Sequence, residues 1–384
     1  MKHWRKIILS GVGCVTVSTN PVSAQVFVSA HDGKQVRAGD LVAGPFPDEV
    51  VTLTLDRTGT PRVIGRVAAP TTMNGPPVSV AVARNGRLAL VASSQRAGAD
   101  GKLVPHGIVS AIDLRDPAQP RVTGQLELPP GTMGIGLLLD AKRALVASAS
   151  DDSVSLVAIA ADGSLQRLQT IKLEAKSDPR DVVIARDGRS AYVVRFGDGR
   201  LTRLAINGDG VRRTADIAVG KNPDGGVISR DGRFLYNSNF GGTSFSGTAG
   251  AISAVDLARG EMVAGIEVGP TPEHVALSPD GRYLAAVIGN GSAFTRTATN
   301  FAEVTGRLKV LRVDGARLVA VAEAPIGHNC QGAAFSDDGR TILVQCAVEK
   351  TISSFRFDGK ALTPVSEVLT FDARPGAIAT GKSR

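Results

Sequence analysis

The chain has 384 residues and is mildly basic, with 44 Lys and Arg against 36 Asp and Glu. It contains no run of five Lys or Arg, so its charge does not indicate a nucleic-acid partner. Its 44 Gly and 20 Pro suit many short strands joined by tight turns. The single Trp, Trp4, excludes a repeat of the Trp–Asp type.

The first 24 residues have the pattern of a secretory signal peptide. Three basic residues lie within the first six, an apolar stretch covers residues 7–17, and Val22-Ser-Ala24 supplies the small residues of a cleavage site. The apolar stretch is too short to span a bilayer. We therefore expect a periplasmic or secreted mature chain, residues 25–384, that is not embedded in a membrane. Lipidation at Cys14 is the alternative, although the expected leucine does not precede it.

A hairpin signature occurs six times along the chain. Its clearest copy is Thr271–Ala286, in which Ser278-Pro-Asp-Gly281 separates two apolar runs. Pro279 fixes φ at the first turn position, and Gly281 accepts a positive φ. The third turn position recurs at residues 86, 142, 188, 232, 281 and 339, with spacings of 56, 46, 44, 49 and 58 residues. A strand-rich repeat of this length is typical of a propeller.

Two further strand-like segments follow each hairpin, which gives six four-stranded units over about residues 75–372. The hairpins span Pro77–Ala92, Thr132–Ala147, Pro179–Val194, Pro223–Asn237, Thr271–Ala286 and Cys330–Val344. Third strands are expected at Gly107–Leu114, Asp152–Ile159, Gly199–Ile206, Gly250–Leu257, Arg307–Val313 and Lys350–Phe357. Fourth strands are expected at Pro120–Leu128, Leu165–Leu173, Val211–Val219, Glu261–Val268, Arg317–Ala324 and Leu362–Phe371.

The two ends of the mature chain complete a seventh unit. Three segments with period-two alternation lie between residues 25 and 67 and lack an innermost partner. Arg374-Pro-Gly-Ala-Ile-Ala-Thr380 copies the opening of an innermost strand. Pairing residues 25–70 with 374–381 closes the ring and leaves only short, protected edges. We therefore predict an all-β, seven-bladed propeller of four-stranded blades, closed by its termini, with residues 25–384 as one domain.

The sequence also resembles a known propeller group. The runs Ile252–Leu257, Val263–Gly269 and Pro272–Ala286 look like the YVTN-type propeller repeat, and the wider chain is similar to the propeller-fold lactonases, which include phosphogluconolactonase-like and muconate-lactonising enzymes. The shared residues are turn and core residues, so the resemblance implies a fold rather than an activity. Members of this group often have Pro-Arg-His where an inner strand begins. Here Pro179-Arg180 keeps the Arg, and Pro272-Glu273-His274 keeps the His.

Cys330 and Cys346 lie in the last full hairpin. If Ser336 pairs with Arg340 across the turn, the two cysteines face each other, with Cα atoms about 4.5–5.5 Å apart and within disulfide reach. Export would place them in an oxidising compartment. We expect a structural disulfide, and the alternatives are a buried free pair or a redox role.

Polar residues gather where the inner strands are expected to begin, at one mouth of the central channel. The candidate catalytic residues there are Arg180, Glu273 and His274, and the candidate ligand-binding residues are Asp181, Asp224, Arg296, His328, Asn329 and Gln331. Three long connections are expected on the same face, where binding residues tend to lie. They are Ser93–His106, Phe240–Gly250 and Gly289–Glu303.

This set of residues supports three interpretations. In a lactonase, His274 or Glu273 would act as general base on water. Arg180, with Arg296, would stabilise the oxyanion or hold a substrate carboxylate. A divalent cation could instead bind the carboxylates and imidazole of Asp181, Asp224, Glu273 and His274. In the third interpretation, the side chains only solvate a water-filled channel mouth or bind a partner.

No GxSxG elbow, Walker loop or dinucleotide-binding glycine motif is present, so a serine hydrolase, a nucleotide-dependent enzyme or a dehydrogenase is not expected. The sequence favours an exported propeller that binds a small molecule or a periplasmic protein partner at the channel-mouth face. The alternative is a cofactor-free lactonase that hydrolyses a sugar-acid or carboxymuconate-type lactone.

Overall fold

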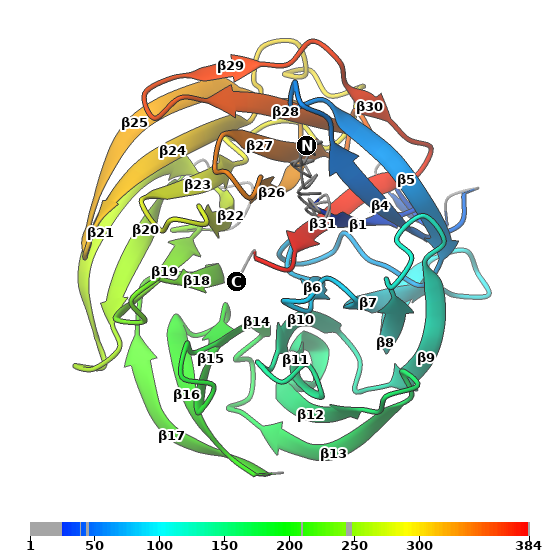
Figure 1. Cartoon of the computed structure of the whole chain (residues 1–384), viewed down its shortest axis with the longest axis vertical. Helices are drawn as coiled ribbons and strands as arrows, with labels where there is room; N and C mark the ends of the chain where they lie inside the picture. Colours follow the sequence, from blue (N-terminus) through cyan, green and yellow to red (C-terminus); the bar gives the residue numbers. More distant parts are fainter. Residues whose placement is uncertain (1–24, 39, 44–45, 209, 243–247, 383–384) are drawn as a thin grey trace, which may run out of the picture.

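The computed structural model describes residues 25–38, 40–43, 46–208, 210–242 and 248–382, and the structural statements below concern these residues. The predicted signal peptide, residues 1–24, lies outside them. The described chain forms seven blades arranged around a central axis and one separate two-stranded sheet (Figure 1). Its one short helical turn is Ala149–Asp151, and no helix in the described part is long and apolar enough to cross a membrane.

Six blades follow one another along the chain, and in each the first strand is innermost (Figure 1). Blade 1 comprises β6 (Val80–Val82), β7 (Leu88–Ala97), β8 (Leu103–Asp113) and β9 (Arg121–Glu127). Blade 2 comprises β10 (Thr132–Leu137), β11 (Arg143–Ser148), β12 (Ser153–Ile159) and β13 (Leu165–Lys172). Blade 3 comprises β14 (Pro179–Ile184), β15 (Ser190–Arg195), β16 (Arg200–Asn207) and β17 (Gly210–Ala218).

The next three blades repeat the same antiparallel meander. Blade 4 comprises β18 (Pro223–Ile228), β19 (Phe234–Asn239), β20 (Ala249–Asp256) and β21 (Glu261–Pro270). Blade 5 comprises β22 (Pro272–Leu277), β23 (Tyr283–Ile288), β24 (Arg307–Asp314) and β25 (Arg317–Pro325). Blade 6 comprises β26 (Cys330–Phe335), β27 (Thr341–Cys346), β28 (Thr351–Phe357), β29 (Leu362–Pro364) and β30 (Leu369–Thr370).

The seventh blade joins the two ends of the described chain. Its strands are, from the inside outward, β31 (Arg374–Thr380), β1 (Phe27–Asp32), β4 (Glu49–Leu55) and β5 (Pro61–Ala68). Phe27 pairs with Thr380 and Asp32 with Arg374 in an antiparallel ladder. The prediction of a seven-bladed propeller closed by terminal strand pairing is confirmed.

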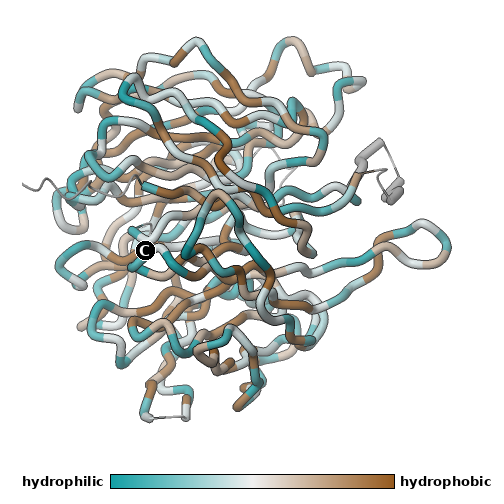
Figure 2. The backbone as a smooth tube through the Cα atoms, turned by 45° about the vertical axis from the view of Figure 1, so that its right-hand side comes forward, coloured by the Kyte–Doolittle hydropathy of each residue, from teal (hydrophilic) through white to brown (hydrophobic). Residues whose placement is uncertain are grey.

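The hydrophobic core is divided among the seven interfaces between neighbouring blades. Each of seven clusters of buried apolar side chains draws on two adjacent blades. Between blades 1 and 2, for example, Leu90 and Val109 pack in one cluster with Val146 and Val157. The hydropathy colouring shows the same division, with brown stretches within the strands and teal at many of the turns (Figure 2). Both faces of every sheet are therefore covered by a neighbour.

Three local features differ from the sequence expectation. The predicted Ser93–His106 loop is largely a hairpin, because β7 and β8 stay paired out to Ala97 and Leu103. The predicted outer strand Leu362–Phe371 is split into β29 and β30. Between the pairs Phe355–Pro364 and Ile352–Leu369, the outer segment has two more residues than β28, so it cannot stay paired throughout. An additional hairpin of β2 (Gln35–Ala38) and β3 (Asp40–Ala43) lies between β1 and β4.

The expected disulfide is present. Cys330 and Cys346 are paired in register across β26 and β27, and both are buried. Their Cα atoms are 3.7 Å apart, closer than the separation expected for a regular antiparallel pair. The ladder shifts register between Cys330 and Ala333, so the pair lies at the edge of a bulge, where regular strand spacing does not hold.

Removing this bond is expected to destabilise the protein. Replacing both Cys330 and Cys346 with Ala opens a loop of 16 residues, which corresponds to a loss of about 3 kcal/mol in the free energy of unfolding. Denaturant unfolding measures the loss, and the reduced wild-type protein should behave like the double variant. Titration of two thiols other than that of Cys14 in denatured, unreduced protein would contradict the assignment.

Candidate functional site

Most of the candidate residues lie at bulges where the inner strands begin, whereas Arg296 lies in the connection between β23 and β24, and His328 and Asn329 precede β26. In β14, Pro179 pairs with Arg195 but Asp181 pairs with Val194, so Arg180 is an extra residue. The same irregularity follows Pro223 in β18 and Pro272 in β22. A bulge re-aims the side chains beside it and is common next to functional sites.

Arg180 and Asp224 form the central ion pair of this region. The Nη1 atom of Arg180 donates to Asp224 Oδ1 at 2.9 Å, across the interface of blades 3 and 4. Its Nε and Nη2 atoms donate to Asp178 Oδ2 at 3.2 and 3.0 Å. The guanidinium carbon lies 3.4 Å from the centre of the Phe196 ring, which is a cation–π contact. Arg180 is therefore held from three sides while its side chain stays 21% exposed.

The carboxyl group of Asp224 is buried and only partly compensated. Burial raises its pKa to about 6; Arg180 opposes this shift, whereas the neighbouring carboxylates Asp178 and Asp181 add to it. Its Oδ2 atom has no hydrogen-bond partner among the described residues. The side chain thus combines one oxygen fixed by an arginine with a second oxygen that can accept a proton near neutral pH.

The pKa of Arg180 is shifted by the same carboxylates. Burial by itself would lower the pKa of Arg180, but the carboxylates of Asp224 and Asp178 outweigh burial and hold that pKa above its ordinary value. The guanidinium therefore stays cationic at any pH at which the protein is folded. A permanent positive charge beside a titratable carboxylate is an arrangement found in acid–base sites.

Asp181 lies next to this pair, but its carboxylate accepts hydrogen bonds from backbone N–H groups. Its Oδ1 atom accepts from the N–H of Val182 at 2.7 Å, and its Oδ2 atom accepts from the N–H of Gly226 at 3.0 Å. The second bond crosses from blade 3 to blade 4. The structure therefore places Asp181 in the cluster, where it braces the strands that carry Arg180 and Asp224.

His274 and Glu273 are buried in the next blade along. The Nδ1 atom of His274 accepts the backbone N–H of Ala333 in blade 6 at 3.1 Å. A neutral ring that accepts at Nδ1 carries its proton on Nε2. The predicted role of His274 as a general base would require this ring to give up the bond to Ala333.

His328 anchors a surface connection. Its Nδ1 atom lies 2.5 Å from Glu349 Oε1 and its Nε2 atom 2.6 Å from the Phe301 carbonyl oxygen. The ring is therefore held between the carboxylate of Glu349 and the backbone of Phe301. It also stacks on the Phe301 ring, with the ring centroids 3.9 Å apart, and the guanidinium carbon of Arg296 lies 5.8 Å from the Phe301 centroid. Arg296 thus contacts Phe301, whereas Arg180 contacts Phe196, so the two arginines do not share one aromatic partner.

Asn329 and Gln331 form a buried amide pair beside His328. The Nε2 atom of Gln331 donates to Asn329 Oδ1 at 3.0 Å. The remaining donor, Asn329 Nδ2, and the remaining acceptor, Gln331 Oε1, are buried without a partner among the described residues. Unpaired buried amide atoms are costly unless a water or ligand satisfies them. Both residues keep their assignment as candidate ligand-binding groups.

The candidate residues do not line an open, water-filled mouth. Seven of them are buried: Asp181, Asp224, Glu273, His274, His328, Asn329 and Gln331. The burial of these side chains does not fit the interpretation that they only solvate a water-filled mouth, and binding of a partner stays a prediction.

The segment Thr71–Val78 packs beside the candidate residues and covers part of this mouth. A Cβ added at Gly225 would lie 3.7 Å from Val78 Cγ1 and 4.0 Å from Pro76 Cβ, and one added at Gly332 would lie 3.1 Å from Pro77 Cβ. The segment therefore touches blades 4 and 6 although it precedes blade 1. A signal for it was present in the sequence, because the stretch between β5 and β6 is the longest connection from one blade to the next.

Acidic groups of blade 7 hold this segment in place. The N–H of Met73 donates to Asp32 Oδ2 at 3.0 Å, and the N–H of Thr71 donates to Asp48 Oδ2 at 3.0 Å. Lys34 Nζ bridges the two carboxylates, at 3.3 and 2.8 Å. Burial raises the pKa of Asp32, and Lys34 partly offsets that rise. Charge-assisted hydrogen bonds therefore hold Thr71–Val78 in place, and this segment is called the cover below.

The geometry gives no support for the predicted alternative of a divalent cation. In the described part of the chain, no group of three or more His, Cys, Asp or Glu side chains is placed to hold a metal ion. The oxygens of Asp181 accept from backbone N–H groups, and Asp224 is paired with Arg180.

Residues 135–316, just under half of the chain, match the family model described as "Lactonase, 7-bladed beta-propeller". This range contains Arg180, Asp224, Glu273 and His274. A search of curated proteins finds no match.

Solved structures show the same fold over nearly the whole chain. A proposed 6-phosphogluconolactonase from Bacteroides uniformis is 16% identical, with a TM-score of 0.72, and the match covers 93% of this chain and 99% of that one. A periplasmic gluconolactonase from Pseudomonas aeruginosa is 19% identical, with a TM-score of 0.69 and the same coverage. Hydrazine synthase from Kuenenia stuttgartiensis is 20% identical over 76% of this chain and 79% of that one, with a TM-score of 0.59.

At these identities the structural matches establish the fold, and the family match adds the lactonase-type sequence pattern. The resemblance expected from the sequence is confirmed. The chain is a seven-bladed β-propeller similar to the propeller-fold lactonase group.

Proposed function

We propose that the protein is a lactone hydrolase whose reaction centre is the Arg180–Asp224 pair. The observation that carries the proposal is the state of Asp224, whose Oδ1 atom is bound by Arg180 while its buried Oδ2 atom is unpartnered in the described structure. A pKa of about 6 suits a base that works near neutral pH. The family match includes both residues, which supports a lactonase rather than another hydrolase.

The reaction needs a base and an oxyanion partner. Asp224 Oδ2 accepts a proton from water as the water oxygen bonds to the lactone carbonyl carbon. Arg180 also has N–H groups that are not bonded to Asp178 or Asp224. These groups stabilise the negative charge that develops on the lactone carbonyl oxygen. When the ring C–O bond breaks, Asp224 returns the proton to the departing oxygen, and the product is a hydroxy acid. The charges and protons balance without an oxidant or a bound cofactor.

The other candidate residues supply recognition in this proposal. The free amide atoms of Asn329 and Gln331 suit hydroxyl groups, which both donate and accept hydrogen bonds. Polar groups of this kind favour a sugar-acid lactone over a purely apolar one. Glu273 remains the alternative base, and a divalent cation the alternative to a cofactor-free reaction.

A second candidate function is binding without turnover by an exported propeller. It is favoured by the cover over the site, since Thr71–Val78 packs against Gly225 and Gly332 and leaves Asp224 only 1% exposed. The pattern of a signal peptide at residues 1–24 supports a location in the periplasm or outside the cell for this candidate. A small-molecule ligand or a protein partner would then be held at the same face.

Asp224→Asn is expected to abolish most lactone hydrolysis. The amide has the shape of the carboxylate but cannot act as base, so kcat should fall about 100-fold or more. Hydrolysis of aldono-, carboxymuconate-type and simple γ- and δ-lactones in a pH-stat, with and without chelator, provides the measurement. Asp187→Asn, in an exposed turn, is the matched control and should retain full activity. If the wild-type protein turns over no lactone, the binding function stands instead.

The pH profile of kcat/KM should report Asp224. The carboxylate is the active form, so activity should fall about tenfold for each pH unit below about pH 6 and level off above it. Arg180 lowers the pKa of Asp224, so Arg180→Met should move this limb to higher pH as well as reduce the rate. A limb that stays at the same pH in Arg180→Met would identify a different base.

Access to the site should depend on the cover. Asp32→Ala removes the acceptor for the N–H of Met73 and one partner of Lys34, so Thr71–Val78 should detach more often. Native-state hydrogen exchange of the amides in 71–78 should accelerate at least tenfold, while exchange in blade 4 stays unchanged. Equal protection in the variant and the wild-type protein would show that the segment is held without Asp32, by its bond to Asp48 and its apolar packing.

A further inference from the structure

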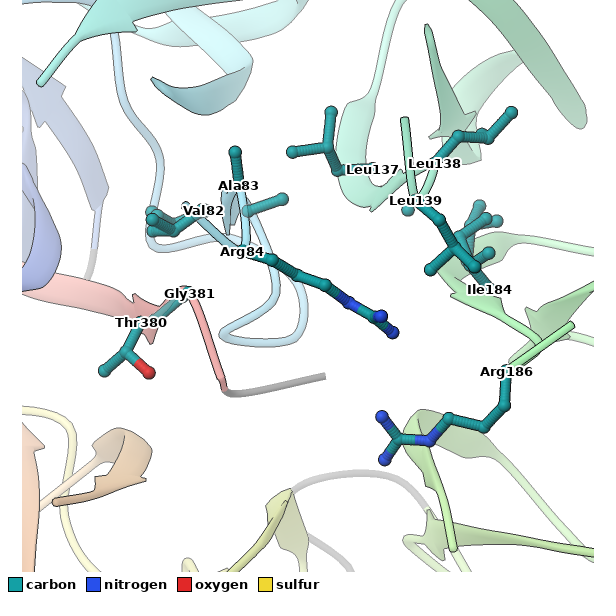
Figure 3. Close-up of a pocket in the computed structure, with 15 residues that line it drawn as sticks. Val82, Ala83, Arg84, Leu137, Leu138, Leu139, Ile184, Arg186, Thr380 and Gly381 are labelled. Atoms are coloured by element: carbon teal, nitrogen blue, oxygen red, sulfur yellow. The ribbon is translucent and has the colours of Figure 1, made fainter. Parts of the chain in front are cut away.

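The opposite mouth of the channel carries a second pocket, which the proposed hydrolysis does not use. It lies where the inner strands β6, β10, β14 and β31 end, and its enclosed space is small, about 60 Å³. Arg84 and Arg186 project into it from two blades (Figure 3). Arg186 follows Arg180 by six residues along the inner strand of blade 3, so at ~3.3 Å per residue the two mouths are about 20 Å apart.

The turns between the first two strands of the blades build this mouth. Their second positions ring it in blades 1 to 6 and are occupied by Arg84, Leu139, Arg186, Arg230, Pro279 and Asp337. The side chain at this position rests on the glycine of the next turn: a Cβ added at Gly232 would lie 3.4 Å from Arg186 Cβ, and one added at Gly281 would lie 2.8 Å from Arg230 Cβ. The repeat geometry therefore directs three arginines to one opening, where Lys382 of the last blade joins them.

These arginines have no carboxylate partner in the described chain. Arg186 donates from Nη2 to the Ile228 carbonyl oxygen at 3.1 Å, and Arg230 donates from Nη1 to the Pro279 carbonyl oxygen at 2.9 Å. Arg84 is exposed and makes no hydrogen bond or ion pair with any described residue. The one acid of the ring, Asp337, is already paired with Lys382 at 2.8 Å.

The positive charges also act on one another. Burial, together with the charges of Arg84 and Arg230, holds the pKa of Arg186 below its ordinary value. Like charges held this close raise the free energy of the folded protein, and a bound anion would relieve the repulsion. None of the residues that line the two adjoining pockets at this mouth is acidic, and all of them belong to the described chain.

One wall of the pocket is apolar. Leu137, Leu139 and Ile184 line it beside the arginines (Figure 3). Leu139 is 40% exposed, which is unusual among the large apolar side chains of this chain. An apolar wall next to unpaired guanidinium groups matches a ligand with one oxyanion group and one apolar part.

We propose that this mouth binds a small amphipathic organic anion. Arg84, Arg186 and Arg230 hold its carboxylate or phosphate group, and Leu137, Leu139 and Ile184 contact its apolar part. The site is separate from the reaction centre at the other mouth and does not depend on lactone hydrolysis.

Calorimetric titration of the mature protein with octanoate, octyl phosphate, inorganic phosphate and octanol tests this proposal. Octanoate or octyl phosphate should bind at least tenfold more tightly than inorganic phosphate, and octanol should not bind. The ratio of the first two affinities shows whether the site prefers a carboxylate or a phosphate. Equal weak binding of all three anions would overturn the proposal.

The variants Arg84→Gln and Arg186→Gln should each weaken binding at least tenfold. Arg233→Gln is the matched control, because Arg233 follows the blade 4 turn but is exposed, paired with Asp256 and absent from the lining of both pockets, and it should bind like the wild type. Arg84 bonds to no described residue, so Arg84→Gln should keep its thermal stability, and unchanged affinity in this folded variant would overturn the proposal. Asp224→Asn should leave anion binding intact, which separates this test from that of lactone hydrolysis.

Discussion

The fold depends on apolar contact between neighbouring blades. No blade has a core of its own, since the seven hydrophobic clusters each lie between two sheets. Removing one blade would expose the apolar faces of its two neighbours. The free-energy cost is roughly 25 cal/mol for each Å² of apolar surface exposed to water. This arrangement moves the core away from the axis. The ends of the inner strands are then free to carry polar side chains such as Arg180 at one mouth and Arg186 at the other.

The two mouths use this freedom in different ways. At the first, bulges turn Arg180 and Asp224 toward each other across a blade interface, and Thr71–Val78 removes the pair from bulk water. Desolvation then gives the carboxyl its unusual pKa. At the second, regular turns present arginines that stay open to solvent and lack acidic partners. The same repeat therefore yields a covered, paired site and an exposed, unpaired one.

The sequence was sufficient for the blades because their signals are local. Turns such as Ser278–Gly281 and period-two strands recur at a steady spacing, and counting the strands left over at the ends predicted the closure. Cys330 and Cys346 followed from the register of one hairpin. The cover over the site was not predicted, because Thr71–Val78 is positioned by contacts with residues such as Gly225 and Gly332 far along the chain. Hydrogen-bond partners are equally non-local, so His274 was favoured as base before its bond to Ala333 was known.

Closure of the ring has a consequence for how the protein is made. Strand β1 hydrogen-bonds to β31, and the paired residues Phe27 and Thr380 are 353 positions apart in sequence. At roughly 5–20 residues per second, a ribosome needs about 20–70 s to make the chain between them. For that time β1 has no inner partner, and an unpaired strand edge invites pairing with other chains. The nascent protein therefore needs either a chaperone or delayed collapse until its last blade is complete.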